Sequence, residues 1–249
     1  MVETYSFINY LIMATFLAQV NALTSLGIST GTTPTNDEVT QFLRDGVMDV
    51  TSKHLSVRPQ DAEDFVIEST ESSSQGGLST DGGKILHVMR ESGTNDDWRD
   101  CRKIPIGLKD RVTDTTSLHY ASAYNPAYIL SQYGAVLVFP APSGSSGQYR
   151  IYYVNKTPVD NVDGSALAHG DSTIRYFPDD KVYLVVIYAG IKALEAKLSS
   201  YTIDEEDSEL VVSLQSILQQ LRADYNGGFL PDKRQEALMQ AATQRRAEG

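Results

Sequence analysis

The chain of 249 residues contains few of the residue types that build covalent or metal-bound frameworks. It has one cysteine, Cys101, which excludes an intrachain disulfide framework and a cysteine-rich zinc site. Its four histidines are His54, His87, His119 and His169, and no two of them have the helical spacing of a metal-binding pair. We therefore expect no metal and no cofactor, and the single thiol is compatible with a reducing compartment.

Basic residues are also scarce. There are 21 lysines and arginines against 32 aspartates and glutamates, which gives a formal net charge of −11 and a pI of about 4.8. A surface that wraps nucleic acid needs lysine and arginine to displace counterions from phosphate, so this composition argues against such a role. It still allows DNA to pass through without being held, because an acidic wall repels phosphate.

A long apolar run is found near the start of the chain, at residues 5–26. A secretory signal would need a positive flank, but Glu3 stands there. Asn9, Gln19 and Asn21 also interrupt the run. We therefore expect an amphipathic helix, not an export signal or a membrane span.

Catalytic motifs are missing too. The serine-glycine run 143–147 lacks the spacing of a nucleophile elbow and is typical of a hairpin tip. The glycine pairs at 76–77 and 82–83 lack the lysine of a phosphate loop. Residues 160–164 hint at a calcium loop, but no glutamate closes it. The charged stretch 96–102 favours a solvated loop or an intersubunit salt bridge. The sequence therefore predicts a protein that is not an enzyme.

Three further helical segments are expected. Residues 37–55 form one, capped by Thr35 or Asn36, with Gly46 indicating close packing at its middle. Residues 177–202 form a second that is apolar around most of its circumference, so other protein must enclose it, and its charged residues exclude lipid. Residues 204–228 form a third with a narrower apolar stripe.

The second and third helices are predicted to pack as antiparallel neighbours, because a short loop joins them. The expected contacts are Val182, Val185, Val186, Ala189 and Leu194 against Leu214, Ile217, Leu218 and Leu221.

Between the helices the apolar period changes to that of strands. Six short strands are expected, at 65–69, 84–90, 102–106, 127–132, 135–140 and 148–155. The predicted fold class is α+β: a helical bundle with an inserted antiparallel β sandwich or barrel-like module and an extended C-terminal arm. The expected domains are the N-terminal helices at 1–60, the β domain at 61–175, the helix pair at 176–228 and the arm at 229–249.

Two charged segments each have a purely structural and a functional interpretation. The arm carries a short helical patch with basic residues, and it is either a frayed end or a docking arm; its candidate docking residues are Lys233, Arg234, Leu238, Arg245 and Arg246. An acidic cluster precedes the third helix, and it either complements the helix dipole or lines a channel; its residues are Asp204, Glu205, Glu206, Asp207 and Glu209.

The order of these parts resembles the head-to-tail adaptor, or connector, proteins of tailed bacteriophages. The resemblance is carried by NDEVTQFLRDGVMDVTSKHL, KILHVMRES with CRKIPIG, SLHYASAYNPAYIL with GAVLVFPAP, and YFPDDKVYLVVIYAGIKALEAKLS. It covers most of the chain but not the residues before Met13.

The resemblance implies a structural virion protein at the head–tail junction, made in the host bacterial cytoplasm. Such adaptors form a ring, usually of twelve copies, between the portal and the next tail or nozzle protein, and double-stranded DNA leaves through the ring without specific binding. The arm would then reach the portal, no membrane would be involved, and the family transfers no catalytic residues. The fourteen tyrosines fit extensive interfaces between copies.

Alternative functions remain open at this point. One is a different ring of the same machine, such as a stopper or tail-tube protein, although those are richer in strands. Another is a receptor- or carbohydrate-binding module on the β region, for which Trp98 and Tyr133 are the suggestive aromatic residues. A third is a hydrolase without a readable motif.

Overall fold

The computed structural model describes residues 14–80, 82–131, 134–154, 157–201 and 208–229. Contacts divide the chain into a helical unit, Met1–Val57 with Val159–Arg175 and Asp179–Gly249, and a β unit, Arg58–Pro158 with Tyr176–Pro178. The fold class is α+β, as predicted, and most of the β unit forms one insertion in the sequence of the helical unit.

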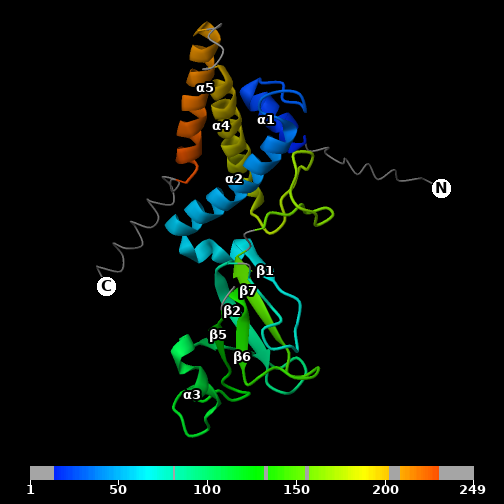
Figure 1. Ribbon diagram of the computed structural model, residues 1–249, viewed down its shortest axis with the longest axis vertical. Helices are drawn as coiled ribbons and strands as arrows, with labels where there is room; N and C mark the ends of the chain where they lie inside the picture. The colour runs from blue at the N-terminus through cyan, green and yellow to red at the C-terminus, as the bar shows by residue number, and fades with distance from the viewer. Residues whose placement is uncertain (1–13, 81, 132–133, 155–156, 202–207, 230–249) are drawn as a thin grey trace, which may run out of the picture. The chain divides into compact units, whose positions relative to one another are not determined.

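The helical unit is built around one central helix, α4 (Val182–Tyr201). It packs against α1 (Phe16–Thr24), α2 (Asn36–Val57) and α5 (Ser208–Gly227) (Figure 1). A single 3₁₀ turn, η4 (Asp179–Lys181), leads into α4. Neighbours on several sides explain why α4 is apolar over most of its circumference, because each side removes a different set of its side chains from water.

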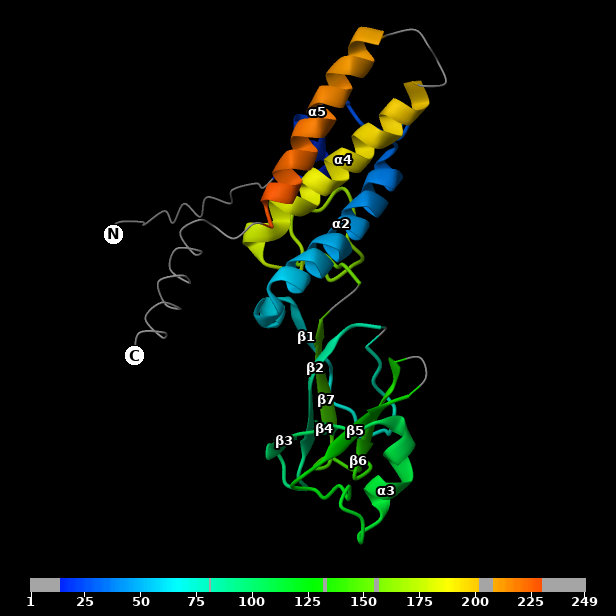
Figure 2. The ribbon, with the colours of Figure 1, turned by 90° about the vertical axis from the view of Figure 1, so that its left-hand side faces the viewer.

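Most of the residues predicted to pack between α4 and α5 are buried, which confirms that part of the prediction. The two helices lie side by side (Figure 2). The residues found buried as predicted are Val185, Val186, Ala189, Leu194, Leu214, Leu218 and Leu221. Val182 and Ile217 are half-buried, whereas Leu184 and Tyr225 are buried although the sequence did not single them out.

Helix α2 begins with a reciprocal cap. The backbone N–H of Glu38 donates to Oγ1 of Thr35 at 3.3 Å, and the backbone N–H of Thr35 donates to Oε2 of Glu38 at 2.7 Å. This capping box satisfies two of the backbone donors that a helix start leaves without partners. Thr35, not Asn36, is therefore the capping residue.

The prediction that the β domain extends to residue 175 is wrong, because its last segment belongs to the other unit. Val159–Arg175 belongs to the helical unit. The backbone N–H of Phe16 donates to the carbonyl of Asp171 at 2.7 Å, and Nε of Arg44 donates to the carbonyl of Leu167 at 2.7 Å. Leu167 is itself fully buried. These contacts hold the segment against α1 and α2. Apolar periodicity in the sequence distinguishes strands from helices, but it does not show which unit a loop packs against.

The β unit begins with a 3₁₀ helix and contains two sheets. Its elements are η1 (Pro59–Phe65), β1 (Val66–Glu68), β2 (Ile85–Glu91), β3 (Trp98–Asp100), β4 (Arg102–Lys103), η2 (Ile106–Leu108), α3 (Lys109–Thr113), β5 (Ala127–Leu130), β6 (Val136–Phe139) and β7 (Tyr149–Val154). One sheet is antiparallel with the order β1-β7-β2-β3, and the other has the order β4-β5-β6.

The strands differ from the sequence expectation in two respects. Trp98–Asp100 forms β3, paired with β2, so the stretch predicted as a solvated loop is a sheet edge. The second sheet is not purely antiparallel, because β4 and β5 run parallel while β5 and β6 run antiparallel. The charged residues Arg99 and Asp100 leave no alternating apolar signal on β3, and the direction of β4 relative to β5 depends on long-range pairing that the sequence does not show.

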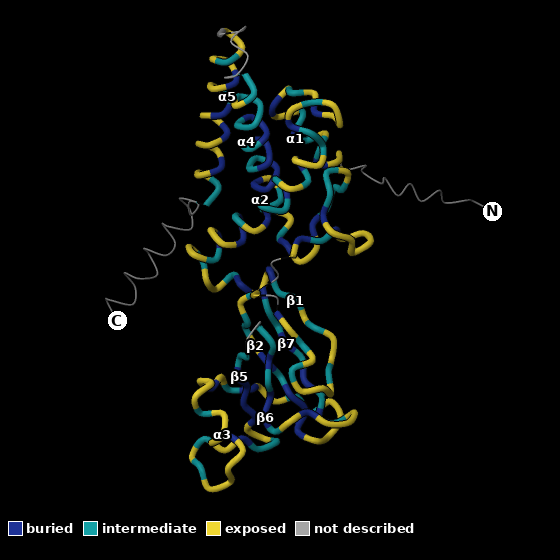
Figure 3. The backbone as a smooth tube through the Cα atoms, in the orientation of Figure 1, coloured by how far each residue is buried: buried dark blue, intermediate teal, exposed yellow. Residues whose placement is uncertain are grey.

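The core of the β unit lies between the two sheets (Figure 3). One cluster joins residues of both sheets: Val88, Cys101, Tyr128, Val136, Val138, Tyr149 and Ile151. The hydroxyl of Tyr149 accepts from the backbone N–H of Leu78 at 3.0 Å and donates to the carbonyl of Val136 at 3.3 Å. This fully buried tyrosine therefore connects β7 to the opposite sheet without an unsatisfied polar atom.

A second apolar cluster closes the end of the β unit that carries α3. It consists of Ile104, Val112, Ala121, Ala127, Ile129 and Phe139. Val112 of α3 is 1% exposed, so this short helix packs against the second sheet.

Candidate functional site

The acidic cluster predicted to line a channel lies mostly outside the described residues. Asp204, Glu205, Glu206 and Asp207 are among those not described. Glu209 is described, and it is exposed in the first turn of α5. An acid at this position interacts favourably with the helix dipole, so its placement agrees with the purely structural interpretation. The channel role stays a prediction.

The candidate docking residues of the arm also lie outside the described residues. They are Lys233, Arg234, Leu238, Arg245 and Arg246. The docking role of the arm therefore stays a prediction.

The four histidines lie in unrelated places. His54 is buried in α2, and His169 pairs through Nδ1 with Oγ1 of Thr40 at 3.0 Å. His87 lies on β2 and His119 beside α3. Within the described ranges no group of three or more metal-ligating side chains comes together.

The loop that hinted at calcium binding is stabilised by its own carboxylate. The buried Asp160 side chain accepts from the backbone N–H of Val162 at 2.8 Å and from the hydroxyl of Thr173 at 2.9 Å. A carboxylate saturated by such donors organises a turn. The serine-glycine run is a hairpin tip, as expected, with Ser143 bridged to Gly147.

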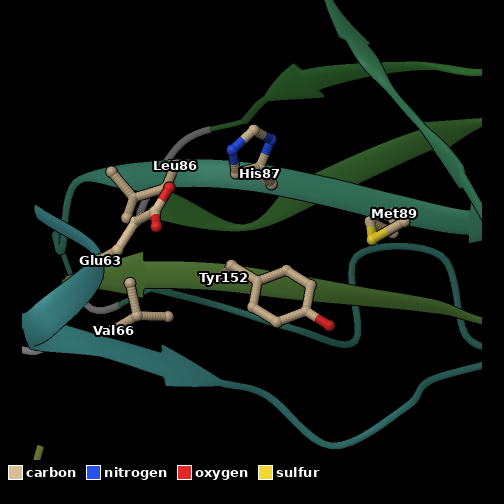
Figure 4. Close-up of a pocket in the computed structure, with 6 residues that line it drawn as sticks. All are labelled: Glu63, Val66, Leu86, His87, Met89 and Tyr152. Atoms are coloured by element: carbon tan, nitrogen blue, oxygen red, sulfur yellow. The ribbon is translucent and has the colours of Figure 1, made fainter. Parts of the chain in front are cut away.

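The first notable surface is a largely apolar groove of about 300 Å³ on the outer side of the first sheet (Figure 4). We call it the outer groove, and it is lined by Glu63, Val66, Leu86, His87, Met89 and Tyr152. These side chains come from η1, β1, β2 and β7.

A β-bulge shapes the outer groove. The register of β2 against β7 shifts between Ile85 and His87. A bulge lets consecutive residues of a strand, here Leu86 and His87, face the same surface. In the sequence, Ile85 and Leu86 are adjacent apolar residues, so the strand alternates imperfectly, which agrees with this irregularity but does not reveal a groove.

An arginine clamp borders the outer groove. The Arg150 guanidinium lies over the Trp98 ring at 4.1 Å from its centroid and pairs with Glu68 at 2.9 Å. The Tyr152 hydroxyl donates to the same Glu68 carboxylate at 2.9 Å. Burial, reinforced by that hydrogen bond, raises the pKa of Tyr152. The clamp fixes these side chains on the outer face of the sheet.

The clamp also affects the carbohydrate-binding alternative. A sugar-binding tryptophan needs a free ring face, and Arg150 covers one of the two faces of Trp98, which leaves at most the other for a sugar. Tyr133, the other suggestive aromatic residue, lies outside the described residues.

The second notable surface is the segment between β4 and β5, which places large apolar side chains in water. Leu118 is 100% exposed and Tyr124 73% exposed, and Ile106 and Tyr120 are exposed as well. We call these four residues the tip patch. Leu118 also borders a groove of about 350 Å³ together with Arg111, Asp114, Thr116, Ser117 and His119.

Local hydrogen bonds hold the chain around Leu118 in place. The Asp114 carboxylate accepts from the backbone N–H of Thr116 at 2.9 Å and from its hydroxyl at 2.7 Å, which lowers the pKa of Asp114. Arg102 Nη2 donates to the carbonyls of His119 and Tyr120, each at 2.8 Å. Leu118 is thus presented by an organised loop. The only sequence signal for it was a single leucine among aspartates, threonines and serines.

Comparison with the models of known protein families and with curated proteins finds no match for this chain. Across the residues that the structure covers, none of the helices combines the length and the apolar character needed to cross a membrane.

Proposed function

We propose that this chain is a structural virion protein that forms a ring adaptor between the portal and the tail of a tailed bacteriophage. In this role it acts at the head–tail junction, is made in the host cytoplasm, and carries out no catalytic step. Its ring continues the channel through which double-stranded DNA leaves the head.

The observation that supports this proposal most is the two-part architecture. A helical unit centred on α4 has its sequence interrupted by a β unit of two packed sheets. This is the order of parts that the resemblance to head-to-tail adaptors leads one to expect. Because many folds serve several functions, the architecture supports the proposal by analogy and needs a direct test.

The charge of the chain fits a channel. A net charge of −11 disfavours retention of DNA, and the proposal assigns the wall to the acidic cluster around Glu209. Exposed aromatic residues fit subunit contacts: Tyr124 is 73% and Tyr183 49% exposed, and a tyrosine in an interface can bury its ring while its hydroxyl stays at the polar rim.

Among the alternatives, a stopper or tail-tube protein is less well supported because long helices form a complete unit here. The receptor-binding alternative is weakened by the Arg150 guanidinium on Trp98.

The decisive test is electron microscopy of the purified protein in negative stain, with the mass of the particles measured in parallel. The proposal expects closed rings with a central channel that bind isolated portal particles. Protein that stays monomeric at high concentration, with and without portal, would contradict it. A chain lacking residues 231–249 tests the arm separately: it should keep its secondary structure and its rings but fail to attach to heads.

A further inference from the structure

We infer that the tip patch of one copy of this chain docks into the outer groove of a second copy, with Leu118 as the inserted side chain. This inference rests on the proposed ring assembly and names the contact that would build it. Both surfaces belong to the β unit, so the argument uses only features of that unit.

The first step is the shape of the two surfaces. Leu118 projects from an organised loop and is 100% exposed. The outer groove of about 300 Å³ offers Val66, Leu86 and Met89 as an apolar lining. It is large enough for a leucine with part of its neighbours. An isolated exposed leucine needs no explanation, but Leu118 is one of four exposed large apolar residues between positions 106 and 124, which favours a contact surface in this region.

The second step is charge. The segment from Pro59 to Glu71, which contributes to the outer groove, carries five acidic residues and no basic one. The segment from Arg99 to His119, which presents Leu118, carries five basic and three acidic residues. In a chain of net charge −11, the segment that presents Leu118 therefore has an excess of basic residues, whereas the outer groove adjoins an acidic segment. Complementary charges of this kind set the orientation and register of a contact.

The third step is placement. Within the β unit, α3 lies at one end and β1 towards the other (Figures 1 and 2). Leu118 follows α3 in the chain, whereas the outer groove is lined in part by η1 and β1. A copy therefore cannot fill its own groove, and the two surfaces differ from one another. Such a head-to-tail contact closes into a ring when its rotation is a whole fraction of a turn, and otherwise continues as a filament.

Two charged side chains of opposite sign border the two surfaces. Glu63 borders the outer groove and is exposed. Arg111 borders the same small groove as Leu118 and is exposed. Arg150, which lies on β7 beside Tyr152 of the outer groove, is already paired with Glu68, so its charge is balanced. We therefore pair Arg111 of one copy with Glu63 of the next.

The test measures assembly by sedimentation and mass photometry. Leu118→Asp should weaken association by at least about tenfold, because it places a charge where an apolar side chain is inserted. Val162→Asp is the matched control, since Val162 is 84% exposed in the helical unit and should leave assembly unchanged. Both substitutions are at exposed sites, so circular dichroism should show wild-type folding.

A charge exchange makes the test specific. Glu63→Lys and Arg111→Glu should each weaken association, and the double variant should restore most of it. In addition, Leu118→Cys combined with His87→Cys should give a ladder of disulfide-linked multimers under mild oxidation. Either cysteine alone should give dimers at most. Cys101 is buried and should not take part.

The outcomes separate this inference from the proposed function. Rings that form normally from the Leu118→Asp variant would overturn the docking contact and leave the ring proposal standing. Normal rings that no longer bind another virion protein would assign the tip patch to that protein and also overturn the contact. A wild-type protein that never associates would overturn both.

Discussion

At the scale of single residues, buried polar side chains fix the loops of the β unit. Glu91 is 3% exposed, and its carboxylate accepts from the backbone N–H of Asp96 at 3.2 Å and of Gln148 at 3.0 Å. One acid thus ties the turn after β2 to the start of β7. Its neighbour Arg90 donates to the carbonyl of Pro140 at 2.9 Å. Buried ions with this many partners organise structure, because leaving them unpaired would be costly.

Cys101 supplies a prediction about alkaline stability. Burial raises the pKa of its thiol to about 12. The unfolded thiol ionises near pH 9, so the unfolded state loses its proton first as the pH rises. The contribution to stability is complete below pH 9 and is lost between about pH 9 and 12. At pH 10 the free energy of unfolding should have fallen by about 1.4 kcal/mol from this group.

The measurement is urea unfolding at pH 7.5 and pH 10 for the wild type and for Cys101→Ala. Burial is the main cause that raises the pKa of Tyr128 and Tyr149, and both proteins share that contribution; the smaller effect of Cys101 on Tyr128 is removed together with the thiol. The variant should be less stable at pH 7.5 because of its cavity, but should lose less on going to pH 10. Equal losses in the two proteins would contradict the assignment.

Gly46 supplies a second prediction at this scale. The sequence indicated close packing at this position, and a Cβ added there would lie 3.1 Å from Cδ1 of Tyr188 and 3.3 Å from the carbonyl oxygen of Val185. Gly46→Leu should destabilise the protein by about 1–3 kcal/mol through overpacking, despite its better helix propensity. Gly227→Leu is the control, because that helical glycine has no neighbour within 4 Å. Similar thermal midpoints for both variants would contradict the close approach of α2 and α4.

At the scale of elements, the long helices and most of the strands could be predicted, but the edge strand β3 could not. The periods of α2 and α4 are long and repeat over several turns, so their apolar positions agree with one another. By contrast, β3 is very short and carries Arg99 and Asp100. Pairing to β2 creates this strand, and such long-range pairing leaves no local sequence signal. The strand predicted at 102–106 is found as β4, but its parallel pairing to β5 could not be derived from the sequence.

The same difference applies to the candidate sites. The outer groove depends on a bulge at Leu86 and on the approach of η1, both of which are properties of the folded unit. The exposure of Leu118 likewise cannot be derived from a leucine in the sequence, since most leucines are buried. The acidic cluster and the basic arm were visible because charge can be read directly from the sequence.

The packing of α4 gives the prediction at this scale. Val186 is 3% exposed, so Val186→Asp would place an unpaired charge inside the helical unit. The expected loss is several kcal/mol, enough to unfold a marginal domain. Val212→Asp on α5 is the matched control, because Val212 is 64% exposed. A wild-type melting temperature for Val186→Asp would show that this face of α4 is not enclosed.

At the scale of the whole molecule, the main feature is that each unit has its own core. Both apolar clusters of the β unit are formed by residues of that unit alone. The helical unit gathers its core around α4 from segments before and after the insertion. A unit that closes its own apolar surface needs no partner to fold, which is the condition for an autonomous domain.

The last prediction follows from this division. A fragment of residues 58–158 should fold alone with a β-type circular dichroism spectrum and unfold cooperatively in urea. It lacks Phe177, whose ring meets Phe65 edge-on with centroids 5.5 Å apart. A fragment of residues 58–178 should therefore be more stable, by about 0.5–1.5 kcal/mol from the ring pair beyond its area burial. Phe177→Ala in the longer fragment should remove that gain. A shorter fragment without a cooperative transition would mean that the β unit depends on the helices for its fold. Equal stability of the two fragments would mean that Phe177 does not stabilise the β unit.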